Sequence, residues 1–153
     1  MKNEGIKHIA ENRRARHDYD LEDTYEAGLS LMGSEIKSIR EGKVNLRQAY
    51  VQIKDGEAWV YDMHISPYTR GGYANHQPMR PRRLLLHKDE IRRLGAQVAQ
   101  KGYTIVPTRL YLKRGRAKLE IALGKGRKAY DKRQAIAERE AQRDIERGMR
   151  EKW

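Results

Sequence analysis

The stretch YDLEDTYEAGLSL, residues 19–31, alternates apolar and polar side chains along almost its whole length. Only Asp23 interrupts the period of two. Such a period places one set of side chains on each face of a β-strand. The stretch therefore predicts a long, half-buried strand with a bulge near Asp23. Its apolar positions are Tyr19, Leu21, Tyr25, Ala27, Leu29 and Leu31.

A short helix is expected directly after this strand, over residues 33–42 (GSEIKSIREG). We expect Ser34 to cap its N-terminus and Gly42 to end it. Ile36 and Ile39 are three residues apart and would face the core together. The solvent side then presents two cations, with a third just beyond the helix: Lys37, Arg40 and Lys43.

The rest of the chain up to residue 123 reads as further strands and one longer helix. Asp55-Gly56 is a strong hairpin signal between two β-rich runs. A long loop with a basic end (residues 80–83) follows, and Leu84-Leu85-Leu86 is apolar enough to be buried. A helix is expected over residues 88–101, and Pro107 indicates a bulge or two shorter strands in the run that follows.

This order of elements is typical of a small Greek-key barrel or a highly curved sheet, as in oligonucleotide-binding barrels, although a different α+β sheet also fits. We expect residues 1–12 to be flexible and residues 13–130 to form one mainly β domain with peripheral helices. Residues 131–153 are charged and alanine-rich, which predicts a tail that is disordered when free and helical along a polyanionic surface. A tail that only confers solubility is the alternative.

The charge balance makes a polyanion the leading partner. The chain has 33 Lys and Arg against 21 Asp and Glu among 153 residues, a net charge of +12. No apolar run approaches the ~20 residues needed to cross a bilayer, and no secretory signal is evident. We therefore expect no membrane partner and a cytoplasmic location. The absence of cysteine excludes disulfides, thiol catalysis and thiolate metal sites.

Residue patterns that would support catalysis are weak. The five histidines show no spacing expected of a zinc helix, and no P-loop is present. Asp18, Asp20 and Glu22 could suggest a metal-dependent nuclease, but their alternation fits a solvent-facing strand equally well. We expect neither enzymatic activity nor a cofactor or metal.

Basic clusters favour nucleic-acid binding instead. All of them abut the end of a predicted element, where folding can gather them onto one surface. With no recognition helix or zinc finger, RNA is favoured over DNA. The clusters are residues 13–16, the set Lys37, Arg40 and Lys43, and residues 80–83, 113–118 and 125–133.

Several ordered motifs resemble the small protein B family, the SsrA-binding proteins that partner transfer-messenger RNA in trans-translation. These motifs are ENRRARHDY (residues 11–19), YEAG (25–28), GSEIKSIREGKVNL (33–46), HISPY (64–68), RRLLLHKDEI (82–91) and GKGRKAYDKR (124–133). The resemblance implies a six-stranded antiparallel oligonucleotide-binding-type barrel with about three short helices.

The resemblance also implies a function. Family members bind the tRNA-like domain of transfer-messenger RNA and deliver it to stalled 70S ribosomes, where the basic tail follows the vacant mRNA path near the decoding centre. Alanyl-tRNA synthetase and elongation factor Tu act on the same RNA complex. The protein itself needs no nucleotide or metal, and we expect a monomer. A ribosomal or ribosome-assembly protein is the alternative, and an RNA-processing enzyme is a third.

Two sets of site residues follow from matching the motifs. The set implied to bind RNA is Arg13, Arg16, His17, Glu26, Lys37, Arg40, Lys43, Asn45, Arg82, Arg83, Leu85, His87 and Lys118. The set implied to face the ribosome is Lys125, Gly126, Arg127, Lys128, Tyr130, Asp131, Lys132 and Arg133. Tyr130 departs from the family, in which many members carry histidine at this position.

Overall fold

Strand β2 (Tyr19–Leu29) is the long strand that the alternating pattern predicts. It pairs in antiparallel fashion with β9 (Arg116–Gly126), from Tyr19 opposite Gly126 to Gly28 opposite Lys118. The register shifts between Glu22 and Thr24, and Asp23 between them has a positive φ of 33°. The predicted bulge is therefore confirmed.

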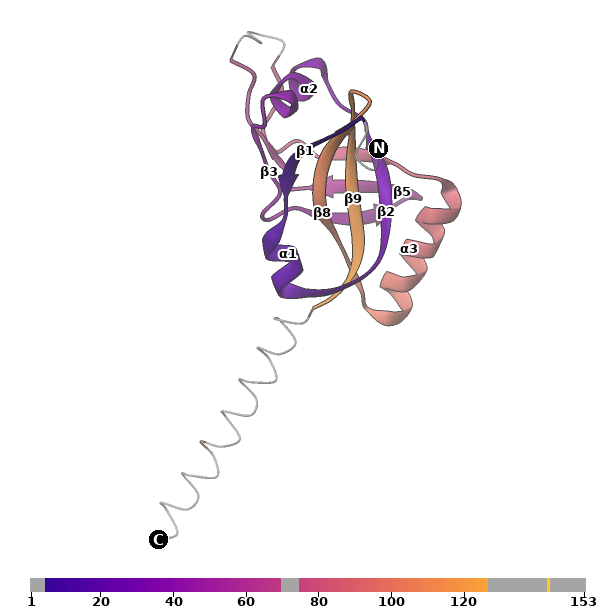
Figure 1. The fold of residues 1–153 in the computed structure, drawn as a ribbon. Helices are drawn as coiled ribbons and strands as arrows, with labels where there is room; N and C mark the ends of the chain where they lie inside the picture. Colours follow the sequence, from indigo (N-terminus) through magenta and orange to yellow (C-terminus); the bar gives the residue numbers. More distant parts are fainter. Residues whose placement is uncertain (1–4, 70–74, 127–142, 144–153) are drawn as a thin grey trace.

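The computed structural model describes residues 5–69, 75–126 and 143 (Figure 1). The tail expected over residues 131–153 lies outside the described residues, apart from residue 143. In chain order the remaining elements are β1 (Ile6–Glu11), α1 (Arg13–Asp18), α2 (Gly33–Arg40), β3 (Val44–Asn45), β4 (Tyr50–Lys54), β5 (Glu57–Tyr61), β6 (His64–Ile65), β7 (Arg82–Leu85), α3 (Lys88–Lys101) and β8 (Thr104–Lys113).

Strand β8 closes the sheet into a barrel because it has partners on both edges. One edge pairs with β9 along its whole length. The other edge is shared: Ile105 pairs with Val51 of β4, and the half from Arg109 to Lys113 pairs with β1. Following the pairs in the order β8-β4-β5-β7-β2-β9 leads back to β8. The predicted six-stranded antiparallel barrel is confirmed, and the different α+β sheet is excluded.

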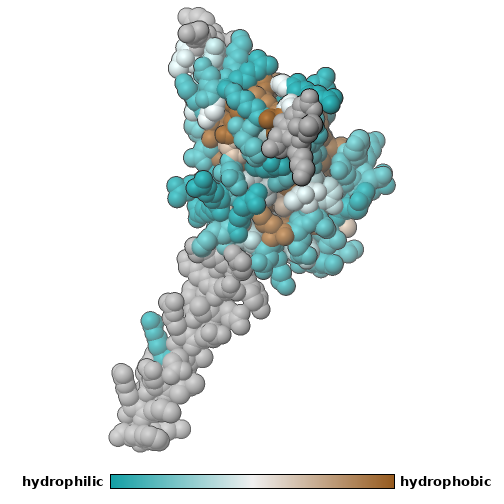
Figure 2. All heavy atoms as spheres, viewed as in Figure 1, coloured by the Kyte–Doolittle hydropathy of each residue, from teal (hydrophilic) through white to brown (hydrophobic). Residues whose placement is uncertain are grey.

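Inward-facing aliphatic side chains fill the barrel. Leu110, Leu119, Ile121 and Val60 are fully buried. Helix α2 adds Ile39 and α3 adds Leu94, both also fully buried. Hydrophilic residues cover most of the face seen in Figure 2, with small apolar patches between them. Among the described helices, none is long and apolar enough to cross a membrane.

The structure has a turn at Asp55-Gly56 and a β-bulge near Pro107, where the sequence predicts them. Asp55 and Gly56 both have positive φ, 52° and 75°, and join β4 to β5 in a two-residue hairpin. The register between β8 and β9 shifts between Pro107 and Arg109, which confirms a bulge rather than two separate strands.

The expectation of a flexible stretch over residues 1–12 is wrong for Ile6–Glu11. These residues form β1 and pair with β8, from Ile6 opposite Lys113 to Glu11 opposite Arg109. The strand shows no clean alternation because it is added to the outside of the closed barrel, where none of its residues is fully buried. The folded domain therefore begins before residue 13.

Helix α1 contains the first basic cluster and was not predicted. Asn12 caps it: its side-chain oxygen accepts from the Ala15 backbone N–H at 3.1 Å. The Asn12 amide nitrogen also donates to the carbonyl oxygens of Leu46 (3.1 Å) and Pro107 (2.9 Å). One buried amide thereby ties α1 to two distant segments of the barrel.

Candidate nucleic-acid interface

Three of the predicted RNA-binding residues meet where β2, β7 and β9 lie side by side. Gly28 of β2 pairs with Leu85 of β7 on one edge and with Lys118 of β9 on the other. Glu26 lies two residues before Gly28, on the same face of β2. We call this surface, defined by Glu26, Gly28, Leu85 and Lys118, the β2–β7–β9 face.

Leu85 is exposed at the centre of this face. Its side chain is 47% exposed, although the sequence suggested that Leu84, Leu85 and Leu86 would all be buried. Along β7 the side chains alternate, so Leu84 points into the core and Leu85 points out. A Cβ on Gly28 would lie 3.2 Å from the Leu85 Cβ, so the glycine provides the space that Leu85 occupies. Sequence reasoning missed Gly28, although a glycine inside a strand signals such a close approach.

Two hollows open on either side of Leu85. One, of about 540 Å³, is also lined by Arg83, His87 and Lys88 at the start of α3. The other, of about 340 Å³, extends to Met32 and Ile36 at α2. Both include Gly28, Leu85 and Lys118. Apolar surface beside cations suits a nucleobase and its phosphate.

The Glu26 carboxylate is held in its charged form. The Tyr111 hydroxyl donates to its Oε2 atom, and the Lys113 Nζ lies 3.5 Å from the same oxygen. The hydrogen bond from Tyr111 is the main cause that lowers the pKa of Glu26, and the charges of Lys113 and Lys118 lower it further. Burial and the bond to Glu26 raise the pKa of Tyr111, so the phenol remains a donor.

A second polar network, formed by Thr108, Arg109 and Glu120, lies beside Tyr111. The Thr108 hydroxyl donates to the Glu120 carboxylate at 2.5 Å, and the Arg109 Nε lies 3.3 Å from the same carboxylate. The Arg109 guanidinium lies 4.8 Å from the centre of the Tyr111 ring. Tyr111 is itself 3% exposed, so its burial and the contact with Arg109 restrict the orientation of its hydroxyl.

The β8–β9 turn adds cations next to Glu26. A hollow of about 620 Å³ is lined by one carboxylate and four cations: Glu26, Lys113, Arg114, Arg116 and Lys118. The predicted basic cluster at residues 113–118 is thus brought against the β2–β7–β9 face. Only Lys118 of these cations was in the predicted site.

The α2 cations form a neighbouring group. Lys37, Arg40, Lys43 and Asn45 are all exposed. The Lys37 ammonium lies 5.6 Å from the centre of the Tyr68 ring, and the Asn45 side chain accepts from the backbone N–H of Arg47 at 2.8 Å. Helix α2, which carries Lys37 and Arg40, itself borders one of the two hollows around Leu85 through Gly33 and Ile36.

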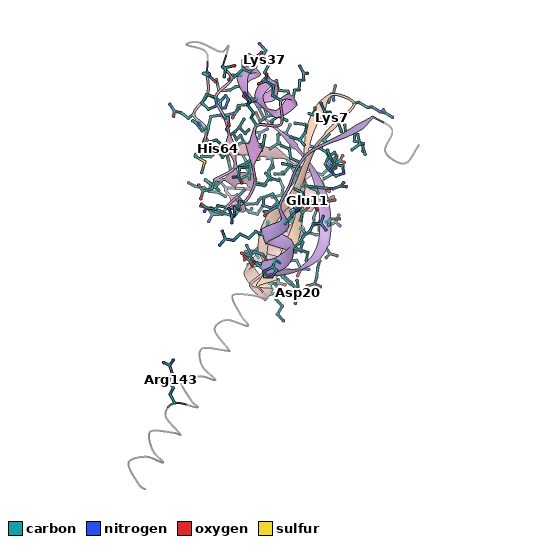
Figure 3. All side chains as sticks on the ribbon, turned by 60° about the vertical axis from the view of Figure 1, so that its left-hand side comes forward. Lys7, Glu11, Asp20, Lys37, His64 and Arg143 are labelled. Atoms are coloured by element: carbon teal, nitrogen blue, oxygen red, sulfur yellow. The ribbon has the colours of Figure 1, made fainter. Side chains whose placement is uncertain are left out.

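The α1 residues lie at the opposite end of the barrel from α2. Figure 1 shows the two helices at the two ends, and Figure 3 places Lys37 and Asp20 correspondingly. Arg13, Arg16 and His17 are exposed there, with Arg16 3.3 Å from Glu11. The structure therefore divides the predicted RNA-binding residues between two ends of the molecule.

Arg82 was predicted to bind RNA, and the structure corrects this prediction. Its side chain is fully buried, with Nε 2.5 Å from the Glu35 carboxylate. Its Nη1 donates to the Met63 carbonyl and its Nη2 to the Pro78 carbonyl (3.1 Å). The adjacent Arg83 is exposed and lies 3.0 Å from Glu57, because successive residues of a strand face opposite sides.

Helix α2 is held by this buried charge. Burial alone would raise the pKa of Glu35, but hydrogen bonds from Arg80, Met32 and Arg82 outweigh it and lower the pKa. Ser34 does not cap the helix as predicted, because Met32 occupies the N-cap position. The Ser34 hydroxyl instead contacts the His76 Nδ1 at 2.8 Å.

The ribosome-facing residues are mostly outside the described part of the chain. Lys125 and Gly126 end β9, and Gly126 pairs with Tyr19 directly after α1. The others, which lie outside the described residues, are Arg127, Lys128, Tyr130, Asp131, Lys132 and Arg133. Across residues 5–69 and 75–126, no group of three or more His, Asp and Glu side chains could hold a metal ion. The acidic row Asp18, Asp20 and Glu22, whose first residue ends α1, is therefore not such a group.

A model of the SmpB protein family matches residues 9–151. The chain belongs to the SmpB family. An SsrA-binding protein from Roseiflexus sp. (strain RS-1) is 63% identical over 145 residues, 94% of this chain and 92% of the relative. One from Thermobifida fusca (strain YX) is 56% identical over 149 residues, 97% of this chain and 93% of the relative.

A solved structure agrees with this SmpB assignment. It is described as "tmRNA-SmpB: a journey to the center of the bacterial ribosome". The matching chain is 49% identical, with a TM-score of 0.67, and the match covers 80% of this chain and 87% of that one.

Proposed function

We propose that this protein is an RNA-binding adaptor that binds the tRNA-like domain of transfer-messenger RNA and delivers it to stalled ribosomes for trans-translation. The observation that carries the proposal is the convergence of Glu26, Leu85 and Lys118 on one face. The match to the SmpB family and to SsrA-binding proteins supports the choice of RNA.

Each side chain of the β2–β7–β9 face has a role in this proposal. Lys118, with Lys113 and Arg116 beside it, neutralises phosphates. Leu85 packs against a base or sugar. The Glu26 carboxylate, fixed by Tyr111, accepts a hydrogen bond from a base amino group or a ribose hydroxyl.

The other exposed residues extend the interface. The set proposed to contact the same RNA is Arg13, Arg16, His17, Lys37, Arg40, Lys43, Asn45, Arg83 and His87. Residues 125–133 and the basic tail face the decoding centre and the mRNA path. Alanyl-tRNA synthetase and elongation factor Tu act on the RNA of the complex in the cytoplasm, and the protein serves as a non-catalytic partner that uses no cofactor.

Titration of the tRNA-like RNA with Lys118→Ala and Glu26→Gln tests the binding face. Each change removes a charge-assisted contact, which is worth enough to weaken binding by about ten-fold or more. Lys101→Ala is the matched control, since Lys101 is an exposed lysine at the end of α3 and lines neither hollow around Leu85. Affinities equal to those of the control would refute the binding face.

The identity of the RNA is tested separately by sequencing the RNA that co-purifies with the full chain. One dominant tRNA-like RNA supports the adaptor. Bulk ribosomal RNA alone would overturn it in favour of a ribosomal or ribosome-assembly protein. Magnesium-dependent cleavage that is lost on changing Asp20 would instead indicate an RNA-processing enzyme.

A further inference from the structure

Four charged residues on neighbouring strands lie opposite one another, in a line that starts at the β2–β7–β9 face. Glu26 of β2 is the cross-strand partner of Glu120 of β9, and Glu120 is the partner of Arg109 of β8. Arg109 is in turn the partner of Glu11 of β1, the strand that runs alongside β8 in Figure 1. Cross-strand partners project from the same face of a sheet. We call these four residues the charge row.

The charge row places two carboxylates, Glu26 and Glu120, directly opposite each other. Like charges in this position repel and destabilise a sheet. The Glu120 side chain is only 19% exposed, so water screens its charge less than that of a fully exposed carboxylate. If Glu120 were uncompensated, its charge would push the Glu26 carboxylate away from the place in which the structure holds it.

Arg109 compensates the charge of Glu120. The Arg109 Nε atom lies 3.3 Å from the Glu120 Oε1 atom, and the Thr108 hydroxyl donates to Oε2 at 2.5 Å. Thr108 lies at the bulge of β8, where the register to β9 shifts. Both oxygens of Glu120 therefore have partners on β8, on the other side of β9 from Glu26.

Contacts with β1 and with Tyr111 hold the Arg109 guanidinium. Its Nη1 atom donates to the His8 Nε2 atom at 3.1 Å, and its centre lies 4.8 Å from the centre of the Tyr111 ring. The charge of Arg109 lowers the pKa of Tyr111 and the charge of Glu120 raises it. Both charges therefore act on the residue whose hydroxyl donates to Glu26.

We propose that Arg109 is a positioning residue for RNA binding, which neutralises Glu120 so that Glu26 stays on the Tyr111 hydroxyl and within reach of the RNA. Arg109 fulfils this role without touching the RNA. Strand β1, which lies outside the closed barrel, supports the guanidinium through His8. The proposal rests on the proposed function, because Glu26 acts on RNA only in that interface.

The first test titrates the full chain with the tRNA-like RNA. Arg109→Gln leaves Glu120 uncompensated opposite Glu26, and we expect it to weaken binding about five-fold. Arg92→Gln is the matched charge control, because the Arg92 side chain is 76% exposed on α3 and lines none of the hollows beside the face. The control should change the affinity by about two-fold or less. Equal effects of the two arginine changes would overturn the proposal, since only overall charge would then matter.

The coupling between Arg109 and the two carboxylates gives the second test. In a Glu26→Gln background, Arg109→Gln should weaken binding no more than Arg92→Gln does, because the side chain that it positions is absent. Adding Glu120→Gln to Arg109→Gln should restore most of the affinity, because the uncompensated carboxylate is removed. The proposal is refuted if Arg109→Gln costs the same factor with and without Glu26, or if Glu120→Gln restores nothing.

A third measurement involves no RNA. Carbon NMR titration of the Glu26 carboxyl should show a higher midpoint in Arg109→Gln than in the wild type or in Arg92→Gln, because a nearby uncompensated carboxylate disfavours the charged form. His8→Ala removes one support of the guanidinium from an exposed position, so it should shift the midpoint in the same direction by less and replaces Arg109→Gln if that variant does not fold. An unchanged midpoint would overturn the positioning role.

The same set of variants separates this proposal from the proposed function. If Glu26→Gln binds the tRNA-like RNA as tightly as the control Lys101→Ala, the binding face itself is refuted, whatever the NMR midpoint shows. If Glu26→Gln weakens binding while Arg109→Gln moves neither the affinity nor the midpoint, the face stands and the role of Arg109 is refuted.

Discussion

At the scale of single residues, the hydrogen bond from the Tyr111 hydroxyl orients the Glu26 carboxylate on the β2–β7–β9 face and lowers its pKa. Among the described residues that line the hollow at the β8–β9 turn, Glu26 contributes the only carboxylate, beside four cations. An unanchored carboxylate there could rotate to pair with any of them. The Tyr111 hydroxyl donates to one of its oxygens, and in the proposed interface the other oxygen accepts from an RNA donor.

Tyr111→Phe should raise the pKa of Glu26 towards its ordinary value of 4.5, because the hydroxyl is the main cause of the lowering. A carboxylate with a lowered pKa stabilises the fold above its unfolded pKa, and this contribution is lost as pH falls through the folded pKa. The variant should therefore lose less stability on acidification than the wild type. Carbon NMR titration of the Glu26 carboxyl measures the shift, and an unchanged midpoint would contradict the assignment.

Gly28→Ala should weaken RNA binding without unfolding the barrel. The new Cβ would lie 3.2 Å from the Leu85 Cβ and 3.4 Å from its Cδ1, so Leu85 must move by a few tenths of an ångström. Titration with the tRNA-like RNA should show a loss of several-fold with a nearly unchanged thermal midpoint. Gly95→Ala is the control, since its Cβ would make only an ordinary 3.9 Å contact with Ile53. Equal affinities for the two variants would show that the position of Leu85 is unimportant.

At the scale of elements, the buried Glu35–Arg82 pair fixes α2 to the barrel. Glu35 belongs to α2, and Arg82 belongs to β7 while also donating to the carbonyls of Met63 and Pro78. Three segments that are distant in sequence therefore meet at one guanidinium. The exposed cations Lys37 and Arg40 keep their position relative to Leu85 through this connection.

Arg82→Met should destabilise the protein by about 3 kcal/mol, because it leaves the buried Glu35 carboxylate with only part of its compensation. Arg83→Met, one residue away, removes an exposed ion pair and should cost about 1 kcal/mol or less. Urea denaturation of both variants gives the comparison. Similar losses for the two would mean that the buried pair does not hold α2.

Elements with a local signal were predictable, and contacts between distant residues were not. The alternation of β2, the Asp55-Gly56 turn and the spacing of α3 each lie within one segment, and the structure confirms them. From the sequence, Arg82 was predicted to belong to a basic surface cluster, because arginine and glutamate side chains are usually exposed. Its partner Glu35 is 47 residues away, so no local pattern indicates that the two form a buried pair. Strand β1 was missed for a related reason, since its order comes from pairing with β8.

On the β2–β7–β9 face, too, some residues could be predicted from the sequence, and others depend on which strands pair. The family resemblance supplied Glu26, Leu85 and Lys118 as site residues, whereas the roles of Gly28 and Tyr111 emerge only once the strands are paired. A tyrosine in an apolar run gives no sign of whether it faces the core or a carboxylate on another strand. The physical reason is that strand register, which the sequence leaves open, decides which side chains become neighbours.

At the scale of the whole molecule, the barrel presents cationic surface at both ends. The β2–β7–β9 face and α2 lie towards one end, and α1 lies at the other (Figure 1). The last strand ends at the α1 end, where Gly126 pairs with Tyr19. The remaining chain therefore leaves the barrel far from Leu85.

Removal of residues 131–153 should accordingly separate binding from ribosome rescue. All strand pairs of the described barrel lie at or before Gly126, and every residue of the β2–β7–β9 face precedes it. The truncated protein should therefore fold and bind the tRNA-like RNA within about two-fold of the wild type, since the tail is expected to act along the mRNA path and not on this RNA. Tagging of nascent chains on stalled ribosomes should be abolished.

Lys118→Ala in the full chain provides the complementary control, because it should lose RNA affinity while its tail is intact. Tagging by the truncated protein at the wild-type level would show that the tail has no role in rescue, and a large loss of RNA affinity would show that the tail contributes to the first RNA site.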